Sequence, residues 1–139
     1  MEINVAQALK VPGKNFPLDA SEDFAPLDLS FCAAHFAGPV SLTGHYYAVG
    51  ESILLNVRLE AAIRIPCDRC LEPFVLCIDE QMRDEFVRTA DDAHPDHYPY
   101  AGQIVVLDAA IIDCVRLAVP LRNLCRADCP GLRHETNNV

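Results

Sequence analysis

The stretch "ILLNVRLEAAIRI", residues 53–65, decides the fold. Every second residue in it is apolar: Ile53, Leu55, Val57, Leu59, Ala61, Ile63 and Ile65. The positions between them include Asn56, Arg58, Glu60 and Arg64. Because successive side chains of a strand point to opposite faces, this period of two predicts a long β-strand with one buried face and one wet face.

The flanking residues extend this strand into a system of hairpins. Gly50–Glu51–Ser52 precedes it and suits a turn from a strand that contains Tyr46 and Tyr47. After "CDRC", residues 67–70, the apolar alternation continues at Phe74, Leu76, Ile78, Met82 and Phe86. We therefore predict three or more antiparallel strands, with "CDRC" at the tip of a hairpin. The acids that follow are interpreted as the wet side of the last strand and its end: Asp79, Glu80, Asp84 and Glu85.

The remaining strands and loops are less regular. Residues 1–10 are compatible with an N-terminal strand, and residues 28–49 contain two short β-like runs broken at Gly38–Pro39. Residues 12–27 carry three prolines and predict a loop. Residues 88–103 carry two prolines and three aspartates without periodicity, and also predict a loop.

The pattern changes to that of a helix after "IVVL" at residues 104–107. Asp108 is suited to cap a helix, and Pro120 is suited to end it. The apolar residues between them lie on one helical face: Ile111, Ile112, Val115, Ala118 and Val119. The predicted fold class is therefore α+β, an antiparallel β-sheet (a meander or a partly closed barrel) with one main C-terminal helix.

Length and composition predict a single domain over residues 1–139, with a frayed polar tail at 133–139. No apolar run approaches the ~20 residues that span a bilayer. The first ten residues lack the basic and apolar regions of a signal peptide, so we expect a cytoplasmic protein. In that reducing compartment, clustered cysteines bind metal or carry out redox chemistry more often than they form disulfides.

The chain is acidic, with a formal net charge of −9 and a pI near 4.8. Affinity for nucleic acid comes mostly from Lys and Arg that neutralise phosphates, so non-specific binding to nucleic acid is disfavoured. A basic protein, such as a ribosomal protein, would be steered toward such a surface. The simpler alternative is that the charge only keeps the protein soluble.

Four of the seven cysteines form two pairs, Cys67 with Cys70 and Cys125 with Cys129. A structural zinc site needs four soft ligands in a tetrahedron, and each pair supplies half of them. Such a site would clamp the C-terminus onto the sheet. Reduced metal-free thiols and a regulatory disulfide are the alternatives. The remaining cysteines lie in apolar patterns and are interpreted as small core residues: Cys32, Cys77 and Cys114.

Signals of catalysis are weak in this chain. It has neither a phosphate-binding glycine loop nor a G-x-S-x-G motif. A redox C-x-x-C begins a helix, whereas Cys67 and Cys70 are flanked by predicted strands. We therefore expect no enzymatic activity.

Four motifs occur in order along the chain: "V-x-L-x-G" at 40–44, "C-D-R-C-L-E-P-F" at 67–74, "V-P-L" at 119–121 and "C-R-A-D-C-P-G-L" at 125–132. Together they resemble the YceD-like family, the large ribosomal RNA subunit accumulation proteins of bacteria and plastids. The matching positions carried over are Cys67, Arg69, Cys70, Leu71, Pro73, Cys125, Cys129 and Gly131. Many relatives continue "G-L-C" and add a further cysteine motif, whereas this chain reads Gly131–Leu132–Arg133.

The resemblance implies a bacterial factor that supports accumulation of 23S rRNA, hence ribosome biogenesis, with zinc at the paired cysteines. The leading hypothesis is a non-enzymatic assembly factor that binds a large-subunit precursor, 23S rRNA or a basic ribosomal protein such as bL32, whose gene commonly neighbours that of the family. Arg58, Arg64 and Arg69 would form a local basic strip for RNA contact. The alternative hypothesis is a zinc-handling or redox-sensing module that uses the same cysteines.

Overall fold

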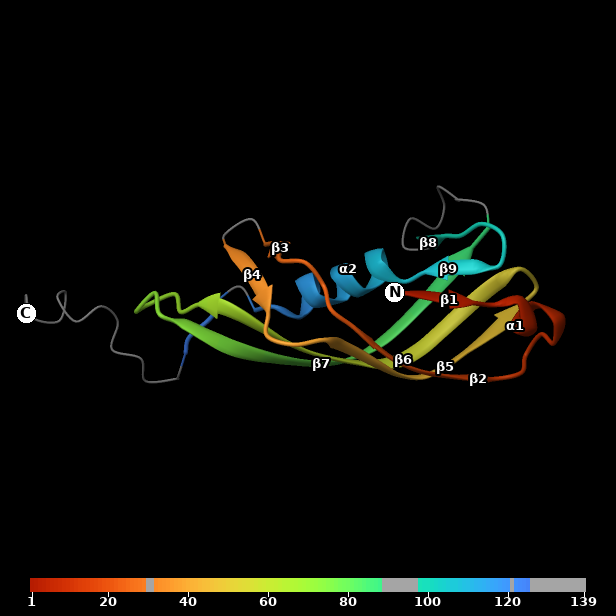
Figure 1. Ribbon diagram of the computed structural model, residues 1–139, viewed down its shortest axis with the longest axis horizontal. Coiled ribbons are helices and arrows are strands. Elements are labelled where there is room, and N and C mark those ends of the chain that lie inside the picture. Colours follow the sequence, from red (N-terminus) through yellow and green to blue (C-terminus); the bar gives the residue numbers. More distant parts are fainter. Residues whose placement is uncertain (30–31, 89–97, 121, 126–139) are drawn as a thin grey trace, which may run out of the picture.

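A long hairpin forms the centre of the molecule. The computed structural model describes residues 1–29, 32–88, 98–120 and 122–125. Strands β6 (Ser52–Pro66) and β7 (Pro73–Val87) pair antiparallel over almost their whole length. The seven alternating apolar residues of β6 are all buried, as the period of two predicted. The elongated shape in Figure 1 follows from this hairpin, whose tip lies at one end of the molecule.

The main sheet has seven strands, built outward from β6. Strand β7 lies on one side of β6, while β5 and then β4 share the other side. The remaining strands extend these edges, with β2 next to β5, β3 next to β4 and β8 parallel to the end of β7. The bounds are β2 (Phe16–Glu22), β3 (Leu27–Asp28), β4 (Ala33–Phe36), β5 (Val40–Val49) and β8 (Tyr98–Pro99).

The connectivity β5–β6–β7 is the predicted meander. The turn from β5 to β6 is a two-residue loop, Gly50–Glu51, in which Gly50 has φ 62°. Glycine at the first position of such a loop favours the tight turn whose twist matches the strands. The partly closed barrel is wrong, because within the described ranges no pairing joins β2 to β7 or β8 and the sheet stays open.

A second layer covers one face of the sheet. Figure 1 shows α2 (Asp108–Ala118), β1 (Glu2–Asn4) and β9 (Ile104–Val106) lying along the same side of the strands. Strands β1 and β9 pair as a small sheet of their own, and α1 (Ala6–Lys10) follows β1. The core lies between these layers. No helix in the described part of the chain is long and apolar enough to cross a membrane.

Two segments differ from the sequence-based prediction. The loop expected over 12–27 contains β2, because Phe16, Leu18 and Ala20 alternate toward the core and Pro17 is tolerated in an edge strand. The N-terminal strand expected over 1–10 is only three residues long and gives way to α1.

The other two segments expected to be irregular lie largely outside the residues that the structure describes. Of the loop predicted over 88–103, residues 89–97 lie outside the described residues, and Tyr98–Pro99 forms β8. The predicted tail at 133–139 also lies outside them.

The single C-terminal helix is confirmed, with one change at its start. Leu107 is the N-cap residue, and Asp108 makes no capping hydrogen bond. Its carboxylate instead accepts a hydrogen bond from the amino group of Met1, which also pairs with Glu22 at 2.9 Å. At the other end, Val119 is extended, as expected for the residue before Pro120.

Candidate metal centre

The tip of the β6–β7 hairpin folds as a tight turn around Cys67. The Cys67 N–H donates to the carbonyl of Glu72 at 2.9 Å, and the Leu71 N–H donates to the carbonyl of Cys67 at 3.0 Å. Leu71 completes the turn with φ 65°, a left-handed conformation that is uncommon for leucine. The Arg69 N–H points at the Cys67 Sγ, 3.4 Å away.

The segment after α2 is docked against this tip by a reciprocal pair of hydrogen bonds. The Asp68 N–H donates to the carbonyl of Asn123 at 2.7 Å, and the Asn123 N–H donates to Asp68 Oδ2 at 2.6 Å. The Asn123 side chain also donates to the carbonyl of Pro120 at 2.9 Å, and Asn123 is only 3% exposed. These bonds fix the backbone two residues before Cys125.

Three sulfurs therefore meet at the tip. The Sγ atoms of Cys67, Cys70 and Cys125 all lie within 4.8 Å of one another, and those of Cys70 and Cys125 are 3.8 Å apart. Zn–S bonds of about 2.3 Å at tetrahedral angles place two thiolates about 3.8 Å apart. A disulfide would need about 2.05 Å. The three residues could hold a metal ion, and their donor set and spacing fit zinc.

The three cysteines of the cluster differ in how deeply they are buried. Cys67 is fully buried, Cys70 is half-buried and Cys125 is exposed. Three of the four cysteines that the sequence predicted as ligands therefore lie close together, and their binding of a metal stays a prediction. The fourth, Cys129, lies outside the described residues.

The other three cysteines lie outside this cluster. Cys32 and Cys114 are half-buried and pack against the core, as predicted. Burial raises the pKa of the Cys32 thiol, and the carboxylates of Asp68 and Asp28 add to the shift, so this thiol stays protonated. Cys77 was predicted in the core but is exposed, because it shares the outward face of β7 with Val75 and Asp79.

The Asp68–Asn123 pair was missed by sequence reasoning. The two residues are 55 positions apart, and neither residue type marks a ligand of a thiolate site. Nothing in the local sequence signals this contact, because only the fold brings the segment after α2 to the hairpin tip.

Replacing Asp68 by alanine is expected to weaken metal binding by about 10–100-fold, the usual effect of losing a group that positions metal ligands. The substitution removes the acceptor of the buried Asn123 N–H and loosens the backbone that carries Cys125. Asp68→Asn keeps an acceptor oxygen and should retain most of the affinity. Competition with a chromophoric chelator measures both variants, and equal affinities for Asp68→Ala and the wild type would contradict the prediction.

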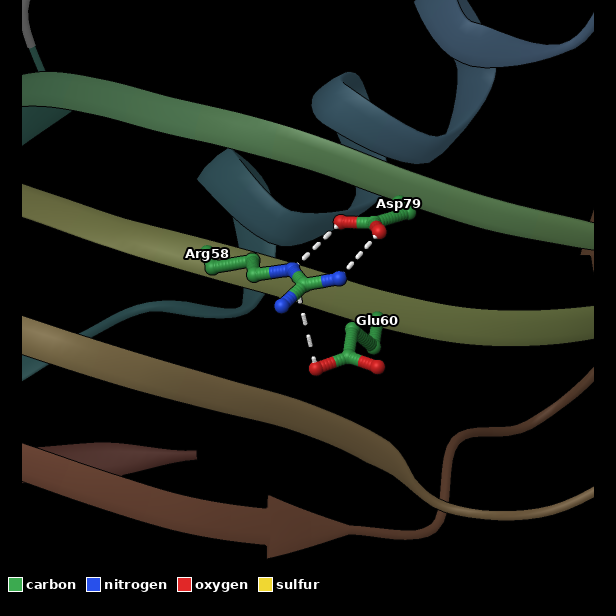
Figure 2. A network of polar contacts seen from close by, with 3 residues as sticks. All are labelled: Arg58, Glu60 and Asp79. Carbon is green, nitrogen blue, oxygen red and sulfur yellow. Dashed lines mark hydrogen bonds and ion pairs between the residues drawn. The ribbon is translucent and has the colours of Figure 1, made fainter.

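The predicted basic strip is partly neutralised by acids. Figure 2 shows Arg58 held between Asp79 on β7 and Glu60 on its own strand. Its Nε donates to Asp79 Oδ1 at 2.7 Å, a second bond joins the same carboxylate, and Glu60 is 3.8 Å away. The hydrogen bonds to Asp79 raise the pKa of Arg58 and lower that of Asp79. Arg64 lies exposed on the same outward face of β6, and Arg69 lies exposed at the tip. Their contact with RNA stays a prediction.

A second polar feature is a groove of about 260 Å³ between β7 and α2. Glu80 and Asp84 were predicted on the wet face of β7, but they share the face of buried Met82, because positions 80, 82 and 84 point the same way. Asp113 of α2 lines the same groove and accepts a hydrogen bond from the Tyr98 hydroxyl at 2.8 Å. Burial raises the pKa of the adjacent Cys114 thiol, and Asp84 and Glu80 add to the shift.

Replacing Asp84 by asparagine is expected to stabilise the protein at pH 7. Burial raises the pKa of Asp84 in the folded state, and the nearby Asp113 adds to the shift. At a pH above this raised pKa, the charged Asp84 carboxylate therefore destabilises the folded state. This destabilisation disappears as the pH falls below the pKa that Asp84 has in the unfolded chain. Thermal unfolding of both proteins at pH 7 and at about pH 3.5 measures this difference in stability. A stability difference that stays constant between the two pH values would contradict it.

Comparison with known proteins places the hairpin tip in context. The family model described as "Large ribosomal RNA subunit accumulation protein YceD" matches residues 55–138. An uncharacterized protein of Mycobacterium bovis and uncharacterized proteins of two Mycobacterium tuberculosis strains are each 27% identical over 138 residues. The alignments cover 95% of this chain and 67% of each relative. No solved structure matches. The matched region runs from β6 through the cysteine cluster and beyond α2. Because this match spans more than half of the chain, the chain belongs to the YceD family of large ribosomal RNA subunit accumulation proteins.

Proposed function

We propose that this protein is a non-enzymatic ribosome-biogenesis factor of the cytoplasm. It would support accumulation of 23S rRNA by binding a large-subunit precursor or a basic ribosomal protein, with bL32 as one candidate. The observation that carries the proposal is the family match over 55–138, which includes the whole hairpin tip. The net charge of −9 supports a polycationic partner over bare RNA.

The cysteine cluster is proposed as a structural zinc site that maintains the binding-competent shape. Cys67, Cys70 and Cys125 would hold the ion, and Cys129 would supply the fourth thiolate. Zinc bound there would join the segment after α2 to the hairpin tip, because one half of the ligands comes from each. Arg58, Arg64 and Arg69 would supply limited RNA contact from the outward face of β6 and the tip.

Sedimentation of the tagged protein at native expression level tests this function. A lysate is centrifuged through sucrose gradients in low and high salt, alongside the variants Cys67→Ser and Cys77→Ser. We expect the wild type and Cys77→Ser to co-migrate with large-subunit precursors in low salt and to be released in high salt, because the attraction is electrostatic. Cys67→Ser should lose this association. Migration only as a free small protein in both salts would contradict the precursor-binding function.

A second candidate function is a zinc-handling or redox-sensing module. It is favoured by the position of Cys125, which is exposed and lies 3.8 Å from the half-buried Cys70, so that a small movement would let the two sulfurs form a disulfide. Mild oxidation of the zinc-loaded protein separates the two functions. A structural site keeps its metal and its cysteines reduced, whereas a sensor releases zinc and forms the Cys70–Cys125 bond.

A further inference from the structure

One edge of the long strand β7 is open among the residues that the structure describes. Its inner edge pairs with β6 from Pro73 to Phe86, whereas the described pairing on its outer edge is confined to Phe86 and Val87, with β8. Among the residues the structure describes, no strand pairs with the outer edge of 73–85. Alternate residues of an edge strand direct N–H and C=O groups outward, where they can pair with another chain. Proline, a common means of blocking an edge, is absent from 74–85.

The open edge borders the groove described above, and α2 forms the opposite wall. Five consecutive residues of β7, 80–84, line the groove. The α2 residues that line it recur at the spacing of one helical face: Ala110, Asp113, Cys114, Leu117 and Ala118. Leu117 is 88% exposed, an unusual position for a leucine on a helix that packs against a sheet. A groove between an edge strand and a helix is a setting in which extended peptides bind by adding a strand.

The charge of the groove selects the kind of peptide. Glu80 and Asp84 project from β7 on the side of α2, and Asp113 faces them. No lysine or arginine forms an ion pair with these three carboxylates in the described part of the chain. Arg83 is the one basic residue among the described residues that line this groove, against three acids. It alternates toward the other face of β7, where it also lines a second groove with Tyr47. The acids would repel nucleic-acid phosphates, and they would also repel a second copy of this acidic edge.

We infer that an extended basic peptide segment of a protein partner binds in this groove as an additional strand on the outer edge of β7. Its backbone pairs with residues 80–84. Its Lys or Arg side chains, at alternate positions, approach Glu80, Asp84 and Asp113, and their aliphatic stems contact Leu117 and Ala118. The eleven residues of α2 extend about 16 Å, enough to face about five residues of such a peptide. The inference deepens the proposed function, because it assigns the basic partner a binding surface.

Isothermal titration of the zinc-loaded full chain with blocked synthetic octapeptides tests the groove. The probe alternates Lys and Val. One control replaces every Lys by Glu, and another carries N-methyl groups on alternate residues, which removes backbone donors but keeps the charge. We expect the Lys–Val peptide to bind, the Glu–Val peptide not to bind, and the N-methylated peptide to bind at least about tenfold more weakly. Equal binding of the parent and N-methylated peptides would overturn strand addition, and no binding by the Lys–Val peptide would overturn the inference.

Paired variants locate the binding. Glu80→Gln with Asp84→Asn removes two charges from the groove, and Asp19→Asn with Asp23→Asn removes two exposed charges on and just after β2. The groove variant should weaken Lys–Val binding about tenfold or more, and the β2 variant should leave it within about twofold. Equal losses would mean that only net charge attracts the peptide.

The peptide titration and the sedimentation experiment can fail independently, so the inference about the groove and the proposed function are tested separately. Peptide binding without co-sedimentation would support the groove while the ribosomal role fails. Co-sedimentation without peptide binding would support the role and remove the groove as its surface.

Discussion

The variant Cys67→Ser should lose its bound zinc and melt about 10 °C or more below the wild type. Cys67 is fully buried at the base of the cluster, and its sulfur accepts the Arg69 N–H. A serine hydroxyl is a poor zinc ligand, so the ion would be left with fewer thiolates. Zinc contributes about 10–16 kcal/mol to the folding of zinc-finger peptides. This chain also has a hydrophobic core, so a loss of only about 3 kcal/mol, at roughly 3–5 °C per kcal/mol, accounts for the shift.

The matched control is Cys77→Ser, which changes an exposed thiol on the outward face of β7 without touching the cluster. Elemental analysis of the purified proteins should give about one zinc per chain for the wild type and for Cys77→Ser, and much less for Cys67→Ser. Chelation of the wild-type zinc should reproduce the lowered melting temperature. If Cys67→Ser and Cys77→Ser melt together and neither changes its metal content, the cluster does not brace the fold.

The hairpin could be predicted from sequence because its signal is local. Alternation along β6 specifies which face is buried, and a shift of one residue would expose the whole apolar set. The edge strand β2 escaped prediction because its three inward residues stand among prolines that are typical of loops. The choice between a meander and a closed barrel also required the structure, since closure depends on pairing between strands far apart in the sequence.

The cluster was partly predictable for a related reason. Two spaced pairs of cysteines are typical of a structural metal site, so the sequence indicates one even though 54 residues separate Cys70 from Cys125. Asp68 and Asn123, which dock the second segment, are ordinary surface residue types with no such restriction. The acids of β7 were assigned to one wet face, although Asp79 and Glu80 are adjacent and must point to opposite faces of a strand. Applying the period of two strictly would have placed Glu80 and Asp84 beside Met82.

The variant Gly44→Ala should be destabilised by about 3 kcal/mol, and its melting temperature should fall by about 10 °C. Gly44 is an interior residue of β5, paired with Leu18 on one side and Val57 on the other. A Cβ at this position would lie 2.3 Å from the carbonyl oxygen of Asn56 and 2.7 Å from the Cα of Val57. Both are backbone atoms of β6, so they cannot rotate away, and the two strands would have to separate.

The sign of the change in stability distinguishes a steric effect of the contact with β6 from the intrinsic preference of strands for alanine over glycine. Alanine is ordinarily favoured over glycine in a strand by about 0.5–1 kcal/mol, because glycine loses more backbone entropy on folding. Gly38→Ala provides the control, since a Cβ there would meet no atom within 4 Å. That variant should be neutral or slightly more stable, and chemical denaturation of both variants measures the two free energies of unfolding. Equal effects at the two positions would contradict close packing, whereas a large loss confined to Gly44 would mean that the glycine of the "V-x-L-x-G" match is required by the contact between β5 and β6.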